Sequence, residues 1–148
     1  MYKRILIATD GSELATRGLQ QGLQLAKANG ASVDIVTVSE PWAMGMYDAM
    51  GWSVGYEASP EYKQEREEGA QAILKPALEA AAAAGVPAQS HHILDRYAAE
   101  GILQAAQDCG SDLIVMTSHG RRGMTRVLLG SQTIEVLTGS TVPVLVIR

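Results

Sequence analysis

Residues 113–133 read LIVMTSHGRRGMTRVLLGSQT, and this stretch sets the expectation for the fold. Its first four residues form an apolar run typical of a fully buried strand, and a loop rich in glycine and arginine follows at once. An apolar run with helical spacing starts at Thr133, so Gly130 and Ser131 lie where a helix should begin. A strand that leads through such a loop to a helix N-terminus commonly binds phosphate in α/β proteins, because backbone N–H groups and the helix dipole converge there.

Over its whole length the chain alternates strand-like and helical segments. Apolar runs predict strands at Ile5–Ala8, Val33–Val38, Ala88–Leu94, Leu113–Met116 and Val142–Ile147. Spacing and capping residues predict helices from Ser12 to about Asn29, from Ser59 to Ala84, from Ala99 to Cys109 and from Ser131 to about Leu137. Pro76 should kink or split the second helix. Five strands alternating with four helical segments predict an α/β fold, a three-layer sandwich around a five-stranded parallel sheet.

Composition narrows the class of protein. The 148 residues suit a single domain, 1–148. A net charge of −4 and a pI near 5.3 argue against a nucleic-acid-binding protein. No apolar run approaches the length needed to span a bilayer, and the N-terminus leads directly into a strand, so we expect neither membrane insertion nor an export signal. The single cysteine excludes an internal disulfide and a cysteine-based metal cluster, which suits a reducing cytoplasm.

The segment Glu40–Ser59 has no strand or helix periodicity and is rich in Met, Trp and Tyr. A structureless insert of this length is uncommon in a compact domain unless it is a lid, a binding loop or an interface. An ordinary surface loop is the alternative, although aromatic residues are costly to leave exposed. The sequence leaves both interpretations open.

The glycine loop contains neither G-x-x-x-x-G-K-[ST] nor G-x-G-x-x-G. It resembles the closing motif of the universal stress protein family, which reads G-x2-G-x9-G-[ST] in nucleotide-binding members. Gly120, nine residues and then Gly130-Ser131 fit the second half of the motif, whereas Thr117 stands at its first glycine. The opening segment Lys3–Ser12 and the closing segment Val142–Arg148 are also similar to the family, so the resemblance covers the whole chain.

This resemblance implies a Rossmann-like fold with strand order 3-2-1-4-5, in which the turns after strands one and four are neighbours. It also implies a cytoplasmic stress-response regulator that binds ATP or another adenine nucleotide, with Mg²⁺ as a candidate companion. Its partners would be a second copy, paired through the C-terminal strand, and a protein whose identity the sequence does not reveal. The implied nucleotide-site residues are Ala8, Thr9, Asp10, Val38, Met116, Thr117, His119, Gly120, Gly130, Ser131, Gln132 and Thr133.

The resemblance implies a role for each of these residues, and several of the roles have a purely structural alternative. Backbone groups of Ala8 and Thr9 would contact the base, and Val38 would form an apolar wall for adenine. Asp10 would accept hydrogen bonds from a ribose or help to hold a metal, or would only cap the first helix. The glycines and hydroxyls from Gly120 to Thr133 would bind phosphate, or would form an ordinary capped helix start. Arg121 and Arg122 would reach a triphosphate or remain in solvent.

Two other functional classes stay open. One is a dimeric interaction module with an empty or vestigial nucleotide site, which Thr117 favours. The other is a phosphotransferase or hydrolase, but the loop lacks lysine and His119 lacks an evident acidic partner, so we expect no catalytic residue and at most very slow ATP hydrolysis. His91 and His92 should point to opposite faces of their strand and cannot share a metal. Cys109 should pack in the core, and we expect no metal site.

Overall fold

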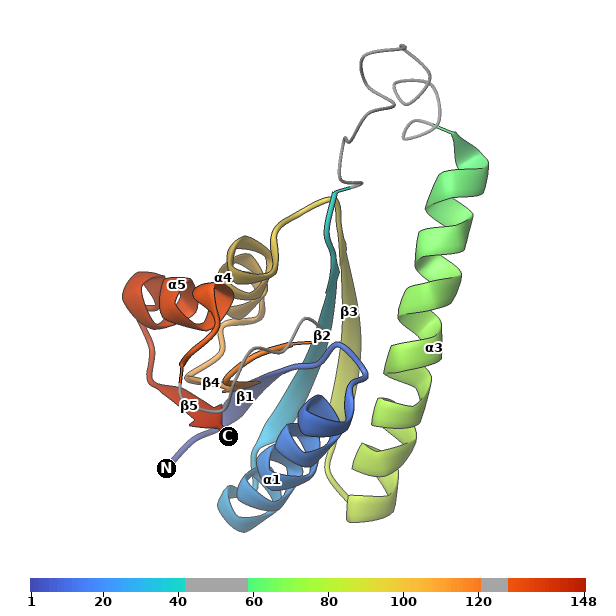
Figure 1. The fold of residues 1–148 in the computed structure, drawn as a ribbon. Helices are drawn as coiled ribbons and strands as arrows, with labels where there is room; N and C mark the ends of the chain where they lie inside the picture. The colour runs from blue at the N-terminus through green and yellow to red at the C-terminus, as the bar shows by residue number, and fades with distance from the viewer. Residues whose placement is uncertain (42–58, 121–127) are drawn as a thin grey trace.

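The computed structural model describes residues 1–41, 59–120 and 128–148, and one parallel sheet organises them. The strands are β1 (Arg4–Ala8), β2 (Ser32–Ser39), β3 (Ala88–Leu94), β4 (Leu113–Thr117) and β5 (Val144–Ile147). They pair in the order β3-β2-β1-β4-β5, which confirms the predicted strand order (Figure 1). Arg121, Arg122 and all but the ends of the Met- and Trp-rich insert lie outside the described residues, so the hypotheses on them stay predictions.

Helices cover both faces of this sheet, as the three-layer prediction requires. The helices α1 (Glu13–Asn29) and α3 (Pro60–Ala84) lie on one face, and α4 (Ala98–Cys109) and α5 (Ser131–Gly139) lie on the other (Figure 1). Alternate strand residues feed two apolar cores. Ile7 and Val115 pack toward α1 and α3, whereas Leu6 and Met116 pack toward α4 and α5. No helix in the described parts of the chain combines the length and apolar character needed to cross a bilayer.

Helix ends follow the sequence signals closely. The Ser12 hydroxyl accepts a hydrogen bond from the Ala15 N–H at 3.2 Å, and Gly30 ends α1 with φ of 66°, a conformation that favours glycine. The prediction that Pro76 splits the next helix is wrong, because α3 runs unbroken from Pro60 to Ala84. Pro76 lies on the exposed side of α3, where water can satisfy the carbonyl that loses its N–H partner.

Strand β5 begins two residues later than predicted. The Ser140 hydroxyl donates to the Val142 carbonyl at 2.7 Å, which holds a turn before the strand. Pro143 has no N–H, although its carbonyl accepts from Ile114 N–H at 3.0 Å. Ladder pairing therefore starts at Val144, and β5 is an outer strand of the sheet. Because β1 pairs directly with β4, the turns that follow these two strands meet at one edge of the sheet.

Candidate functional site

A cleft of about 660 Å³ lies where the carboxyl ends of β1 and β4 meet the N-termini of α4 and α5. Parallel α/β sheets commonly bind ligands at this position, where the strand order reverses. All twelve residues named from the sequence line the cleft, although their ligand roles stay predictions. The lining also includes residues that the sequence did not single out: Val36, Glu40, Tyr97, Ala98 and Ile102.

The loop after β4 is fastened to the start of α5. The N-cap of α5 is Gly130, whose N–H donates to the Ser118 carbonyl at 2.8 Å. The buried Thr133 hydroxyl lies within hydrogen-bond distance of the Thr117 and Ser118 carbonyls, at 3.1 and 3.0 Å. Since glycine has no side chain with which to cap the helix, the N-terminus of α5 faces the cleft without a capping carboxylate or hydroxyl from its N-cap. This arrangement suits an anion.

Gln132 joins the two helix starts that border the cleft. Its side-chain oxygen accepts a hydrogen bond from the Ala99 N–H at 2.8 Å, which satisfies a first-turn donor of α4. The N-cap of α4 is Tyr97, which is not a capping residue type, so Gln132 supplies the cap from a neighbouring helix. The sequence interpretation placed Gln132 near phosphate but missed this cap. Its side-chain oxygen is engaged with α4 and is not the group that would meet phosphate.

Asp10 stabilises its own turn and also faces the β4 loop. One carboxylate oxygen, Oδ1, accepts from the N–H of Ser12, the N-cap of α1, at 3.0 Å, which is compatible with either role predicted for Asp10. A Cβ added to Gly120 would lie 2.8 Å from the other oxygen, Oδ2. The glycine therefore allows the carboxylate to approach the β4 loop closely. This contact brings the acidic turn of β1 and the glycine loop of β4 to the same cleft.

Thr117 replaces the first motif glycine, yet its side chain is directed toward α1. Its hydroxyl donates to the His119 carbonyl at 3.0 Å, and a Cβ added to Gly18 of α1 would meet its methyl carbon at 2.8 Å. The preceding residue, Met116, packs on the opposite face of the sheet with α4 and α5, where the cleft has its apolar floor. Alternation along β4 thus turns the threonine side chain toward the other layer.

The floor of the cleft is apolar and comes from the α4 side of the sheet. Its members are Ala8, Val36, Val38, Ile102 and Met116. The Thr9 N–H donates to the Val36 carbonyl at 2.9 Å, so Thr9 can offer a base its carbonyl but not its amide. The sequence analysis expected backbone contacts to the base from Ala8 and Thr9. Thr9 can therefore provide only a hydrogen-bond acceptor, its carbonyl.

His119, in the loop after β4, does not activate an evident nucleophile in the cleft. His119 Nδ1 lies 3.0 Å from the hydroxyl of Ser118, its neighbour in sequence. Ser118 is only 3% exposed, so its hydroxyl is not presented to a substrate in the cleft. The pair fastens the loop after β4, and we assign it no reaction step.

Three comparisons place the chain among known proteins. A family model described as "Universal stress protein family" matches residues 1–148. The chain is 36% identical over 148 residues to the "Universal stress protein in QAH/OAS sulfhydrylase 3'region" of Thermus aquaticus, and the match covers 100% of both chains. The solved structure of protein MJ0577, from Methanocaldococcus jannaschii, is 28% identical with a TM-score of 0.82 and covers 99% of this chain and 96% of its own.

A more distant structure shares the fold. The Archaeoglobus fulgidus universal stress protein in complex with dAMP has a TM-score of 0.70 and 21% identity, covering 99% of this chain and 98% of its own. A likeness at that identity shows the architecture alone. The bound dAMP is a property of that protein.

Proposed function

The chain belongs to the universal stress protein family, and we propose that its cleft binds an adenine nucleotide, with ATP as the first candidate and Mg²⁺ as its companion. One observation carries this proposal: the N-terminus of α5, preceded by Gly130, faces the same cleft as the Asp10 carboxylate and an apolar floor. Helix N-termini favour anions, and purine rings favour apolar surfaces. The dAMP complex of a related fold is consistent with this choice of ligand.

The lining residues divide the cleft by chemistry. Val38 and Met116 belong to the apolar floor that we assign to adenine. Asp10 is the acceptor that we assign to the ribose hydroxyls, because a carboxylate can accept two such hydrogen bonds. Gly120 and the start of α5 are assigned to the phosphates, and the exposed Ser131 adds a hydroxyl there. We further propose that the protein is a cytoplasmic regulator of the stress response whose nucleotide state is its signal.

Titration calorimetry with ATP in the presence of Mg²⁺ tests the proposal. We expect a micromolar dissociation constant, about −8 kcal/mol, from several backbone donors and an apolar wall. Mass spectrometry of small molecules released from the purified protein gives an independent check. No heat and no thermal shift at millimolar ATP would leave the dimeric interaction module with a vestigial site as the better interpretation.

Asp10→Asn is expected to weaken ATP binding by about tenfold, because a charge-assisted hydrogen bond is replaced by a neutral one. The amide oxygen can still accept from the Ser12 N–H, so the turn of β1 should be preserved. Glu13→Gln is the matched control, since it removes one negative charge from the exposed first turn of α1. Equal affinity for Asp10→Asn and the parent protein would show that the ribose is not bound by this carboxylate.

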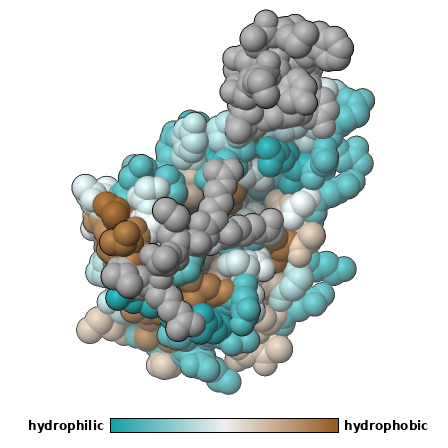
Figure 2. Space-filling view, in the orientation of Figure 1, coloured by the Kyte–Doolittle hydropathy of each residue, from teal (hydrophilic) through white to brown (hydrophobic). Residues whose placement is uncertain are grey.

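The outer strand β5 supports a proposal of assembly. Figure 2 shows hydrophobic surface over α5, at the left of the view. The exposed large apolar residues Ile134 and Leu137 of α5 and Leu145 of β5 lie at this side of the sheet, where β5 leaves an unpaired edge. We propose a homodimer in which the β5 strands of two copies pair across a two-fold axis, because this covers both edges.

Light scattering at tens of micromolar protein should give twice the monomer mass of 15.7 kDa. Leu145→Lys should shift the population to monomer by placing like charges near the two-fold axis. Ala72→Lys, which adds the same charge to the exposed side of α3, should leave the dimer intact. A monomeric parent protein, or equal dimerisation of both variants, would remove this edge as the interface.

A further inference from the structure

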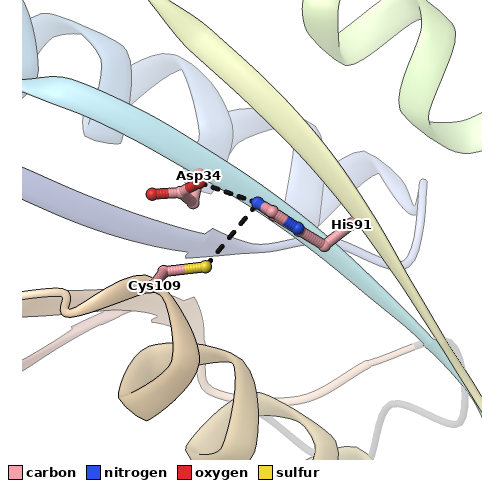
Figure 3. A group of neighbouring side chains, drawn as sticks. All are labelled: Asp34, His91 and Cys109. Carbon is pink, nitrogen blue, oxygen red and sulfur yellow. Dashed lines mark hydrogen bonds and ion pairs between the residues drawn. The ribbon is translucent and has the colours of Figure 1, made fainter.

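A second group of chemically reactive side chains lies away from the phosphate end of the cleft. Asp34 of β2, His91 of β3 and Cys109 at the end of α4 bring one ligand atom each within 4.8 Å of one another. Figure 3 shows one nitrogen of the His91 imidazole directed toward both of the other side chains. The sequence interpretation expected no metal site and assigned Cys109 to packing.

Both contacts end at the same imidazole nitrogen. His91 Nε2 lies 2.7 Å from Asp34 Oδ1 and 3.6 Å from Cys109 Sγ (Figure 3). A Cys–His–Asp catalytic triad would instead use opposite ring nitrogens, one for the thiol and one for the carboxylate. Three ligand atoms that converge from three different elements have the arrangement of a metal site.

We propose that Asp34, His91 and Cys109 form a binding site for Zn²⁺ with one coordination position left for water. Carboxylate, imidazole and thiolate are the ligand types that zinc binds, and three protein ligands plus water are common for this ion. Zinc bonded at about 2.3 Å to sulfur and about 2.0 Å to nitrogen, at tetrahedral angles, places these atoms about 3.5 Å apart. The observed Sγ to Nε2 distance of 3.6 Å already matches this separation.

The carboxylate must move to complete the site. Its oxygen lies 2.7 Å from Nε2 and should retreat to about 3.3 Å, while its separation from sulfur, now within 4.8 Å, should close to about 3.5 Å. These are changes of about 0.6 Å and at most about 1.3 Å for side chains at a strand and at a helix end. His91 is half-buried, so solvent and the ion can reach its side of the group.

The guanidinium of Arg4 is a positive charge next to the proposed zinc site. Its Nε donates to Asp34 Oδ2 at 2.7 Å, and its Nη2 donates at 3.3 Å to Oδ1, the oxygen that also lies nearest to His91. Zinc binding through Oδ1 requires Arg4 to release the longer of these two hydrogen bonds while its Nε stays on Oδ2, and metal-binding carboxylates commonly have such an outer hydrogen bond. Burial works to raise the pKa of Asp34, but hydrogen bonds from Arg4 and His91 outweigh it and hold that pKa below its ordinary value.

The thiol must lose its proton when the ion binds. Burial, followed by the charge of Asp34, raises the pKa of Cys109 above its ordinary value, so the free protein holds a thiol at neutral pH. Zinc would displace that proton to solvent and take the thiolate as its ligand, and the Nε2 proton that His91 donates to Asp34 would move through solvent to Nδ1, which frees the Nε2 lone pair for the ion. The site needs no nucleotide, so it stands apart from the proposed function.

Cobalt substitution gives the sharpest test, because Co²⁺ reports its ligands by absorption. The 148-residue chain should take up one Co²⁺, with tetrahedral visible bands and a thiolate-to-cobalt charge-transfer band, and Zn²⁺ should displace it. Cys109→Ser should abolish the charge-transfer band, and both Cys109→Ser and His91→Gln should lower zinc affinity by about a hundredfold or more in competition with a chromophoric chelator.

His92→Gln is the matched control. His92 is the next residue on β3 but contacts Glu67 of α3 at 2.6 Å, on the other face of the sheet. It should retain full zinc affinity and an unaltered cobalt spectrum. In the unmodified protein Zn²⁺ should also protect the single cysteine from alkylation, a readout that does not depend on any variant folding. A cobalt complex without a sulfur band, unprotected Cys109 or loss of binding in His92→Gln would overturn the proposal.

Discussion

Gly130→Val is expected to lower ATP affinity by about a hundredfold, close to 3 kcal/mol. Gly130 has φ of −62° and ψ of 151°, which any residue adopts, so the substitution does not strain the backbone. Its Cβ would lie 3.2 Å from the Ser118 carbonyl and 3.5 Å from His119 Cα. The loop must shift by a few tenths of an ångström, and the two methyl groups then occupy space beside the start of α5. Phosphate would lose its close approach to the backbone there.

Calorimetry of the variant and of a matched control measures this effect. Gly69→Val makes the same change in α3, where an added Cβ meets nothing within 4 Å, and it should bind ATP like the parent protein. Gly130→Ala should give an intermediate loss. Thermal unfolding of each protein separates lost affinity from lost folding. If Gly130→Val bound ATP normally, phosphate would not lie at the start of α5, although binding elsewhere in the cleft would remain open to test.

The β–α alternation could be predicted from local signals, whereas the strand order, and with it the location of the cleft, was implied by the family resemblance. Apolar runs, caps and the glycine loop predict the β–α alternation, and the family resemblance then supplies the order 3-2-1-4-5. Residues at the ends of β1 and β4 consequently meet at one edge. The sequence analysis missed Val36 and Ile102 because sequence alone does not distinguish an aliphatic residue that lines a cleft from one in the core. Tyr97 was missed because it lies in a short turn before α4 that carries no motif.

Contacts between distant elements account for most of what sequence could not predict. Gln132 caps α4 across 33 positions, and Asp34 meets His91 across 57. The only local signal for the second contact was a charged residue inside the apolar strand Val33–Val38, since a buried carboxylate needs partners. Pro76 is the opposite case, in which a strong local signal predicted a break that solvent exposure of that helix face makes unnecessary.

Gly22→Val is expected to destabilise the protein by about 3 kcal/mol, because it overpacks the contact between α1 and the sheet. A Cβ at this position would lie 2.6 Å from Ile7 Cδ1, 3.1 Å from Ile7 Cγ1 and 3.4 Å from Val115 Cγ1. Both neighbours are fully buried, so the first has little room to rotate away and α1 must lift from β1. The gain from replacing a helical glycine, about 0.5 kcal/mol, offsets only a small part of this cost.

Thermal unfolding checks the expectation, with a decrease in Tm of about 10 °C for a chain of this length. Gly69→Val is again the matched control, since this helical glycine of α3 has open space around it and should leave Tm unchanged or slightly raised. The comparison isolates packing from helix propensity, because both variants replace glycine by valine within a helix. Equal Tm values for the two variants would mean that α1 does not pack on β1 and β4 through Gly22. The close approach of α1 that also seats the Thr117 methyl group against Gly18 would then be in question.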